Sequence, residues 1–137
     1  MAQAGEAVRA EVALMLYPGC QMAMVHGMSD LLQIASSFSR DHGGPVLRVS
    51  HWQMAEDGGF TRVHDSHEGL AGTPEMILIP GRLTGPADAQ EAAPYARWLL
   101  DRHAQGVTLA SNCGGAFILA ATGLLSGRPA TTHWLFA

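Results

Sequence analysis

The chain has 137 residues, of which 47% are hydrophobic and 15% charged, so it suits one folded domain and is too short for two. It has only 8 Lys and Arg residues and a net charge of -4, which disfavours nucleic-acid binding through this segment. No apolar run is long enough to span a membrane and no signal peptide precedes the domain, so we expect a soluble cytoplasmic protein.

The first half of the chain alternates between strand and helix patterns. The continuous apolar run at residues 12–17 predicts a strand that is buried on both faces. Apolar residues at helical spacing then predict a helix over residues 22–39. An alternating run predicts a second strand at 46–54. A pair of glycines then predicts a hairpin turn, followed by an antiparallel edge strand at 60–64.

The second half continues the same alternation. It predicts a buried strand at 76–79, a helix at 88–103 and another buried strand at 107–111. An almost wholly apolar helix follows at 114–122, and a further short strand is expected at 130–133. Strands that alternate with helices form parallel sheets with right-handed crossovers, so we expect a flavodoxin-like, three-layer α/β/α fold with a mainly parallel sheet.

The domain boundaries follow from this pattern. Residues 1–10 are expected to form a flexible N-terminus, and residues 11–137 form the domain. The sequence ends at residues 133–137, where a new element begins, and a doubly wound domain needs further strands and helices. We therefore expect that the C-terminal part of the domain is missing.

The strongest chemical signal is a cysteine between a strand and a helix. The buried strand runs directly into Cys113, and Gly114 and Gly115 open the helix. Such an elbow raises the sulfur above the carboxyl end of the sheet, and the amide of Gly114 can stabilise an oxyanion. The alternative is that Cys113 is a small buried hydrophobic residue, as free cysteines often are.

His133 is the natural partner for this cysteine. It follows Cys113 by 20 residues, which is enough chain for a helix to run out and a strand to return beside the elbow. An adjacent imidazole would make the thiol a better nucleophile. The alternative is a histidine bonded to backbone carbonyls, and the sequence leaves both interpretations open.

These residues resemble a known family. The C-terminal block is similar to the cysteine-elbow signature of the ThiJ/PfpI branch of the class I glutamine amidotransferase-like superfamily, and in particular to the sensor domain of AraC-type transcription regulators. Tyr17-Pro18-Gly19 and Ile79-Pro80-Gly81 also match. The matching residues of the C-terminal block are Ser111, Cys113, Gly115, Ala116, Phe117, Gly123, Leu124, Leu125, Gly127, Arg128, Ala130, Thr131, Thr132, His133 and Trp134.

The sequence departs from the family pattern at three positions. The resemblance places Met24 where the enzymes of the superfamily carry an acid that touches the cysteine, and methionine cannot transfer a proton. Gly114 replaces the usual threonine. Arg82 replaces a second glycine after Pro80-Gly81, and it either binds an anionic ligand group or lies solvated at the surface.

Two functions are therefore weighed. The favoured one is a non-catalytic ligand-sensing and dimerisation domain of an AraC-type regulator, which binds a small-molecule effector, forms a homodimer and meets DNA only through a helix-turn-helix domain that this chain lacks. The alternative is a cysteine enzyme (an amidase, an isonitrile hydratase or a glyoxalase-like enzyme) that uses Cys113 and His133 as a dyad. The expected ligand-binding residues are Met24, Gly81, Arg82, Cys113, Gly114, Gly115, His133 and Trp134.

Other polar features carry less weight. The stretch from His64 to Glu68 has the composition of a metal site, but we interpret it as a solvated loop and expect neither a metal nor a cofactor. The remaining histidines are scattered and suggest no shared site. Cys20 lies in a loop that should border Cys113, and we expect both cysteines to remain thiols in a reducing compartment.

Overall fold

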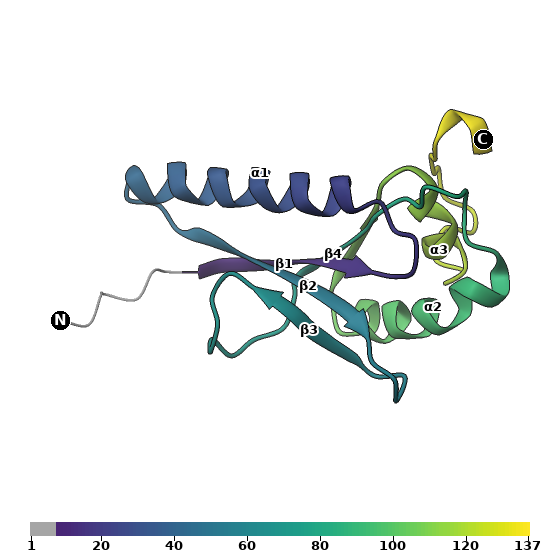
Figure 1. Ribbon diagram of the computed structural model, residues 1–137, viewed down its shortest axis with the longest axis horizontal. Coiled ribbons are helices and arrows are strands. Elements are labelled where there is room, and N and C mark those ends of the chain that lie inside the picture. The colour runs from purple at the N-terminus through teal and green to yellow at the C-terminus, as the bar shows by residue number, and fades with distance from the viewer. Residues whose placement is uncertain (1–7) are drawn as a thin grey trace.

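A computed structural model describes residues 8–137, which form one five-stranded sheet with helices on both sides (Figure 1). The larger elements, in chain order, are β1 (Val8–Leu16), α1 (Met22–Asp41), β2 (Val46–Met54), β3 (Phe60–Asp65), β4 (Met76–Ile79), α2 (Ala89–Ala104) and β5 (Thr108–Ser111). Three short helices follow, namely η1 (Cys113–Gly115), α3 (Ala116–Ala120) and η2 (Trp134–Phe136), of which η1 and η2 are 3₁₀ helices.

The sheet has the strand order β3-β2-β1-β4-β5. β1 pairs in parallel with both β2 and β4, and β4 pairs in parallel with β5. β3 is antiparallel to β2 and forms one edge. This confirms the predicted flavodoxin-like α/β fold. After β1 the chain adds β2 on one side of the sheet, and after β4 it adds β5 on the other side. The carboxyl ends of β1 and β4 therefore form the point where ligands bind in open α/β sheets.

The helices lie in two layers. His51 of β2 bonds to Ser29 of α1, whereas the next residue, Trp52, packs against Trp98 of α2. Because successive strand residues point to opposite faces, α1 and α2 must cover opposite faces of the sheet. Figure 1 shows this arrangement, with α1 along one side of the strands and α2 on the other.

The core is centred on β1 and β4. Ala13, Leu14 and Met15 in β1 and Ile77 and Ile79 in β4 have no exposed surface, as expected for parallel strands covered on both faces. On the α2 side, an aromatic cluster of Trp52, Phe60, Tyr95 and Trp98 extends this core to the sheet edge. In α2 the buried residues are Ala92, Ala96, Trp98 and Leu99, whereas Leu100 is exposed.

Helix α1 turns the unexpected face toward the sheet. Its buried residues are Val25, Ser29 and Ser36. Of the apolar residues that predicted the helix, Leu32 packs partly buried against the core, whereas Leu31, Ile34 and Phe38 are exposed. The serines are buried because each finds a polar partner. The Ser29 hydroxyl donates to the carbonyl of Val25 and lies 2.8 Å from the His51 ring, and that of Ser36 accepts from the Leu47 N–H.

The predicted boundaries need four corrections. β1 begins at Val8, so residues 8–10 of the expected flexible N-terminus belong to the sheet, while residues 1–7 lie outside the described part of the chain. The helix predicted at 114–122 is shorter, with η1 followed by the five-residue α3. Residues 130–133 form no strand and lead into η2, because within residues 8–137 nothing pairs with the outer edge of β5. The fourth is the end of α1, which lies at Asp41, two residues beyond the predicted end.

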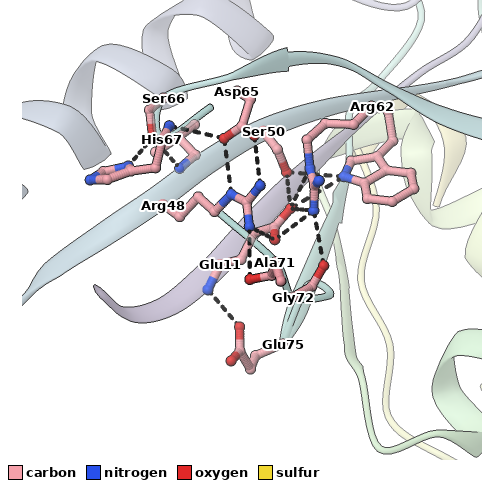
Figure 2. Close-up of polar contacts among 12 residues, drawn as sticks. Glu11, Arg48, Ser50, Arg62, Asp65, Ser66, His67, Ala71, Gly72 and Glu75 are labelled. Carbon is pink, nitrogen blue, oxygen red and sulfur yellow. Dashed lines mark hydrogen bonds and ion pairs between the residues drawn. The ribbon is translucent and has the colours of Figure 1, made fainter. Parts of the chain in front are cut away.

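A buried ion-pair network joins the first three strands (Figure 2). Glu11 of β1 contacts Arg48 of β2 at 3.4 Å and Arg62 of β3 at 2.9 Å, and Arg48 makes a two-pronged contact with Asp65 at 2.6 and 2.9 Å. Ser50 also donates to Glu11. We call the two carboxylates and two guanidiniums the strand network. Their charges cancel, which is the condition for burying charged groups without a large penalty.

Candidate functional site

Cys113 lies on a strained turn between β5 and α3. Its φ of +53° is the one positive φ at a non-glycine residue within residues 8–137. This left-handed conformation costs a residue with a side chain about 1–2 kcal/mol. Two backbone bonds hold the turn, since the Asn112 N–H donates to the Ile79 carbonyl and the Gly115 N–H donates to the Asn112 carbonyl, both at 2.9 Å. The geometry is that of a nucleophile elbow, and the cysteine is partly exposed.

Glycines surround the elbow for different reasons. A side chain on Gly115 would collide with the carbonyl oxygens of Ile79 and Pro80. A Cβ on Gly81 would lie 3.0 Å from the Cβ and 3.4 Å from the sulfur of Cys113. At Gly114 the nearest atoms would lie at 3.8 Å, an ordinary contact. Close approach therefore requires glycine at positions 81 and 115, whereas position 114 has room for a Cβ.

The loop after β1 and the loop after β4 pair beside the elbow. Cys20 forms an isolated antiparallel bridge with Arg82. The Gln21 N–H donates to the Gly81 carbonyl at 2.8 Å, and the Leu83 N–H donates to the Gly19 carbonyl at 3.3 Å. The two loops are thus tied together at the carboxyl edge of the sheet, and Gly81 of the second loop is where they approach Cys113.

The guanidinium of Arg82 bonds to other groups of the protein. Its Nε donates to the Gly85 carbonyl at 2.8 Å and its Nη2 to the Pro86 carbonyl at 3.0 Å. Its Nη1 contacts the Glu91 carboxylate at 2.9 Å, and this contact raises the pKa of Arg82. Arg82 therefore fixes the loop between β4 and α2, and an anionic ligand would have to compete with these three partners.

Tyr17 connects the two loops with the elbow, a role that the sequence analysis did not assign. Its hydroxyl donates to the Pro80 carbonyl at 2.6 Å. Burial raises its pKa, and the nearby thiols of Cys20 and Cys113 add to the rise while Arg82 opposes it. The Tyr-Pro-Gly motif marked this position in the sequence, but only the fold shows that its hydroxyl reaches Pro80 and that its ring packs against Tyr95.

The C-terminal segment lies over the elbow without completing a dyad. The Thr132 hydroxyl donates to the Cys113 carbonyl at 2.9 Å. His133 caps η2, where its Nδ1 accepts from the Leu135 N–H at 3.2 Å, and its ring packs 5.6 Å from that of Phe136. Among residues 8–137, no hydrogen bond joins the Cys113 thiol to His133 or to a carboxylate.

The other predicted site residues are spread around this edge. Met24 lies in the first turn of α1, partly buried against the core. Trp134 is 76% exposed in η2, and its ring lies 5.4 Å from that of His133. The structure thus brings Cys113, Gly81, Gly114 and Gly115 together and leaves Trp134 on the surface.

Three histidines that the sequence treated as unrelated meet on the α1 side of the sheet. The ring of His51 lies 4.5 Å from that of His64 and 6.1 Å from that of His26. Burial, together with these two neighbours, lowers the pKa of His51 to about 4. The simple hairpin register that joins Met54 to Phe60 would place His51 opposite Val63, and an irregularity between His51 and Trp52 shifts the pairing so that His51 lies opposite His64. Sequence patterns give no signal for such a shift.

In the stretch predicted as a solvated loop, the first residues belong to β3 instead. Asp65 ends that strand and contacts Arg48. In the described chain, no three His, Cys, Asp or Glu residues are arranged to hold a metal ion. Nor does any helix of residues 8–137 have the length and apolarity to cross a bilayer.

The sequence comparison fits this geometry. The family model described as "DJ-1/PfpI family" matches residues 29–137, which include the elbow, four of the five strands and the C-terminal segment. This chain belongs to the DJ-1/PfpI family. The matched residues of this DJ-1/PfpI domain include the strained cysteine after β5, and the resemblance to the ThiJ/PfpI branch that the sequence indicated is confirmed.

Two curated relatives extend beyond the family match. An "Uncharacterized protein in cpoL 5'region" of Streptomyces lividans is 26% identical over 125 residues, covering 90% of this chain and 86% of that protein. The "HTH-type transcriptional regulator CdhR" of Pseudomonas aeruginosa is 29% identical over 133 residues, covering 88% of this chain. The chain spans only 35% of the length of CdhR. No solved structure matches this DJ-1/PfpI domain.

Proposed function

We propose that this DJ-1/PfpI domain is the non-catalytic ligand-sensing and dimerisation domain of an AraC-type transcription regulator. The observation that carries the proposal is the state of the elbow. Within residues 8–137, the Cys113 thiol has no hydrogen bond to an acid or an imidazole, and His133 caps its own turn. A base within hydrogen-bond reach is the common means by which enzymes activate a nucleophilic side chain. The similarity to CdhR, a protein named as a transcriptional regulator, supports a regulatory role.

A cysteine enzyme is the second candidate, and the backbone strain at Cys113 is the observation in its favour. A φ of +53° is maintained at a cost, and such strain concentrates at functional sites. The same strain also serves a sensor, because it raises the thiol to the edge of the sheet where an effector can reach it.

Turnover measurements separate the two candidates. The 137-residue protein is assayed on a small amide, an isonitrile and a 2-oxoaldehyde, with the Cys113→Ser variant alongside. Cys20→Ser is the matched control, because it removes the other thiol and leaves the elbow intact. We expect no turnover in any of the three proteins. Turnover that survives in Cys20→Ser and disappears in Cys113→Ser would establish the enzyme instead.

The dimerisation part of the proposal is supported by the outer face of α1. Leu31, Ile34 and Phe38 follow each other at helical spacing and are 59%, 68% and 67% exposed. We define these three residues as the α1 stripe, and we propose that it packs against a second copy of the chain. Contiguous exposed apolar side chains of this kind mark interaction sites.

Sedimentation velocity tests this interface. Ile34→Glu places a charge in the middle of the α1 stripe and should convert a dimer to a monomer. Leu83→Glu is the control, since Leu83 is 77% exposed in the loop between β4 and α2. A monomeric parent protein, or a dimer that withstands Ile34→Glu, would refute the interface.

The proposal places DNA binding outside this segment. CdhR is named as a helix-turn-helix regulator, and two thirds of its length lies beyond the region similar to this chain. The net charge of -4 gives this domain little attraction for phosphates. We expect the 137-residue protein to show no retention of duplex DNA at low salt, and clear retention would contradict this division of labour.

A further inference from the structure

A hollow lies at the carboxyl ends of β1 and β2, beside the elbow but separate from it. Its volume is about 590 Å³, and Cys113 is not among the residues that line it. Volumes of about 300–1,000 Å³ are usual for sites that bind small molecules. We call it the tyrosine–methionine pocket, and the lining residues on which the argument rests are Tyr17, Met22, Met54, Ala55, Glu56 and Tyr95.

The pocket continues into a second, smaller hollow toward α2. That hollow measures about 270 Å³ and shares Tyr17, Met54 and Tyr95 with the first. The rings of Tyr17 and Tyr95 lie 5.9 Å apart at an angle of 59°, and Tyr95 also meets Phe60 edge to face. The two tyrosines are therefore held in fixed positions between the hollows, as a preformed site requires.

The chemistry of the walls selects the ligand. Aromatic rings and the thioethers of Met22 and Met54 form much of the surface, and both groups pack well against flat apolar molecules. The one arginine, Arg82, borders the smaller hollow and is already paired with Glu91 at 2.9 Å. Glu56 is the only charged side chain of the larger hollow, so an anionic ligand would find no free cation there and would be repelled.

We propose that the tyrosine–methionine pocket binds a flat, mainly apolar small molecule without an anionic group, such as an aromatic ring system with a single polar substituent. The inference rests on the proposed sensing function and names the class of its ligand. It also gives Tyr17 a role. The ring of Tyr17 lines the pocket while its hydroxyl bonds the Pro80 carbonyl, next to the Gly81 on which Cys113 packs.

Methionine methyl NMR on the 137-residue protein tests the pocket with 2-naphthol as the probe. We expect the methyl signals of Met22 and Met54 to shift in a saturable way. Met15, which is fully buried in β1, and Met76 in β4 serve as internal references and should stay in place. Unchanged Met22 and Met54 signals at saturating probe would overturn the proposal.

A second test fills the pocket with a larger side chain and compares that variant with the same substitution elsewhere. Ala55→Trp adds a large side chain to the wall of the pocket, and binding should fall at least tenfold. Ala93→Trp makes the same change at an exposed position of α2 that lines neither hollow, and it should bind like the parent. The Met15 signal reports whether each variant is folded. Equal affinities in folded Ala55→Trp and Ala93→Trp would disprove the assignment.

The exclusion of anions is tested with a charged analogue of the same ring. 2-Naphthoate should bind at least tenfold more weakly than 2-naphthol, because the Glu56 carboxylate repels it, and an equal or tighter affinity would contradict the proposed ligand class. Cys113→Ser should retain the full affinity for 2-naphthol, because its side chain does not line the pocket. A protein that binds the probe and also shows cysteine-dependent turnover would refute the proposed function while leaving the pocket intact.

Discussion

The strand network and the cysteine elbow differ in whether their polar side chains have partners. In the strand network, Glu11 and Arg48 are almost fully buried, and every charge meets an opposite one within 3.4 Å. At the elbow, Cys113 is partly exposed, its backbone is strained, and its thiol has no acid or base bonded to it among residues 8–137.

The comparison distinguishes polar groups that hold the fold together from a polar group that is presented to a ligand. The strand network ties β1, β2 and β3 together and also holds the segment before β4, since Arg62 donates to the Gly72 carbonyl (Figure 2). Each charged group of the network already pairs with an opposite charge of the protein. The elbow, in contrast, holds a strained backbone that lowers stability and places a thiol at the carboxyl edge of the sheet. Variants that alter one region at a time can therefore test whether the two regions really differ in this way.

The largest effect is expected from Arg48→Met. This change leaves Glu11 and Asp65 buried without their shared guanidinium, and breaking a buried ion pair typically costs about 3–5 kcal/mol. Urea unfolding measures the loss. Arg97→Met, at an exposed position of α2, is the control and should change the free energy of unfolding by less than about 0.5 kcal/mol. A similar small change for Arg48→Met would mean that the network contributes no structural support.

Gly115→Ala is expected to have the next largest effect. Its new methyl group would collide with the Ile79 and Pro80 carbonyls, which belong to the backbone and cannot turn aside. Overpacking of this kind costs about 1–3 kcal/mol. Gly114→Ala is the matched neighbour, where contacts at 3.8 Å predict a neutral or slightly stabilising change. Equal unfolding free energies for the two variants would show that the elbow is looser than the glycine geometry implies.

His51 tests a buried titratable group outside both regions. Its pKa is lowered from 6.5 to about 4, so the unfolded chain binds a proton that the folded chain refuses between these values. Its stabilising contribution is thus complete above pH 6.5 and is lost as the pH falls toward 4. The groups that face it are His26, His64 and Ser29.

The expected loss between pH 7 and pH 5 is on the order of 1–2 kcal/mol, since each pKa unit corresponds to about 1.4 kcal/mol. Unfolding free energies measured across this range should fall in the parent and stay flatter in His51→Gln. His103→Gln, at an exposed position of α2, should keep the parental slope. The same slope in all three proteins would exclude His51 as the source.

The smallest effect, and the opposite sign, is expected from Cys113→Gly. Glycine adopts a positive φ without strain, so this change should raise the free energy of unfolding by about 1 kcal/mol or less. Cys113→Ser keeps the strain and should leave stability near the parental value. A destabilised Cys113→Gly protein would mean that the cysteine side chain supports the fold more than its strained backbone costs.

The sequence predicted the fold well because buried parallel strands leave a continuous apolar signal. The strands around Leu14 and Ile77 stand out in the sequence for this reason, whereas β5, also predicted as buried, lies at the edge of the sheet and is only partly buried. The buried face of α1 could not be predicted, because Ser29 and Ser36 are inside only through bonds to His51 and to the backbone of Leu47. Hydrophobic periodicity carries no trace of such polar contacts.

At the candidate site, the elbow was predictable and its surroundings were not. The strand-cysteine-glycine pattern specifies the turn at Cys113, whereas the use of Arg82 depends on where Glu91 and the loop carbonyls lie in space. Likewise, the motif around Tyr17 is visible in the sequence, but its bond to Pro80 joins residues 63 positions apart. Contacts of such long range leave no local pattern.

The position of β5 at the rim of the sheet has a consequence for handling the protein. Within residues 8–137, one side of Thr108–Ser111 offers backbone donors and acceptors with no strand beside them. Such a rim is a template on which another extended chain can build. At the opposite rim, β3 carries Arg62, His64 and Asp65, whose polar and charged side chains discourage stacking. Unwanted polymerisation of this domain would therefore start from β5, and a lysine introduced there is the simplest safeguard.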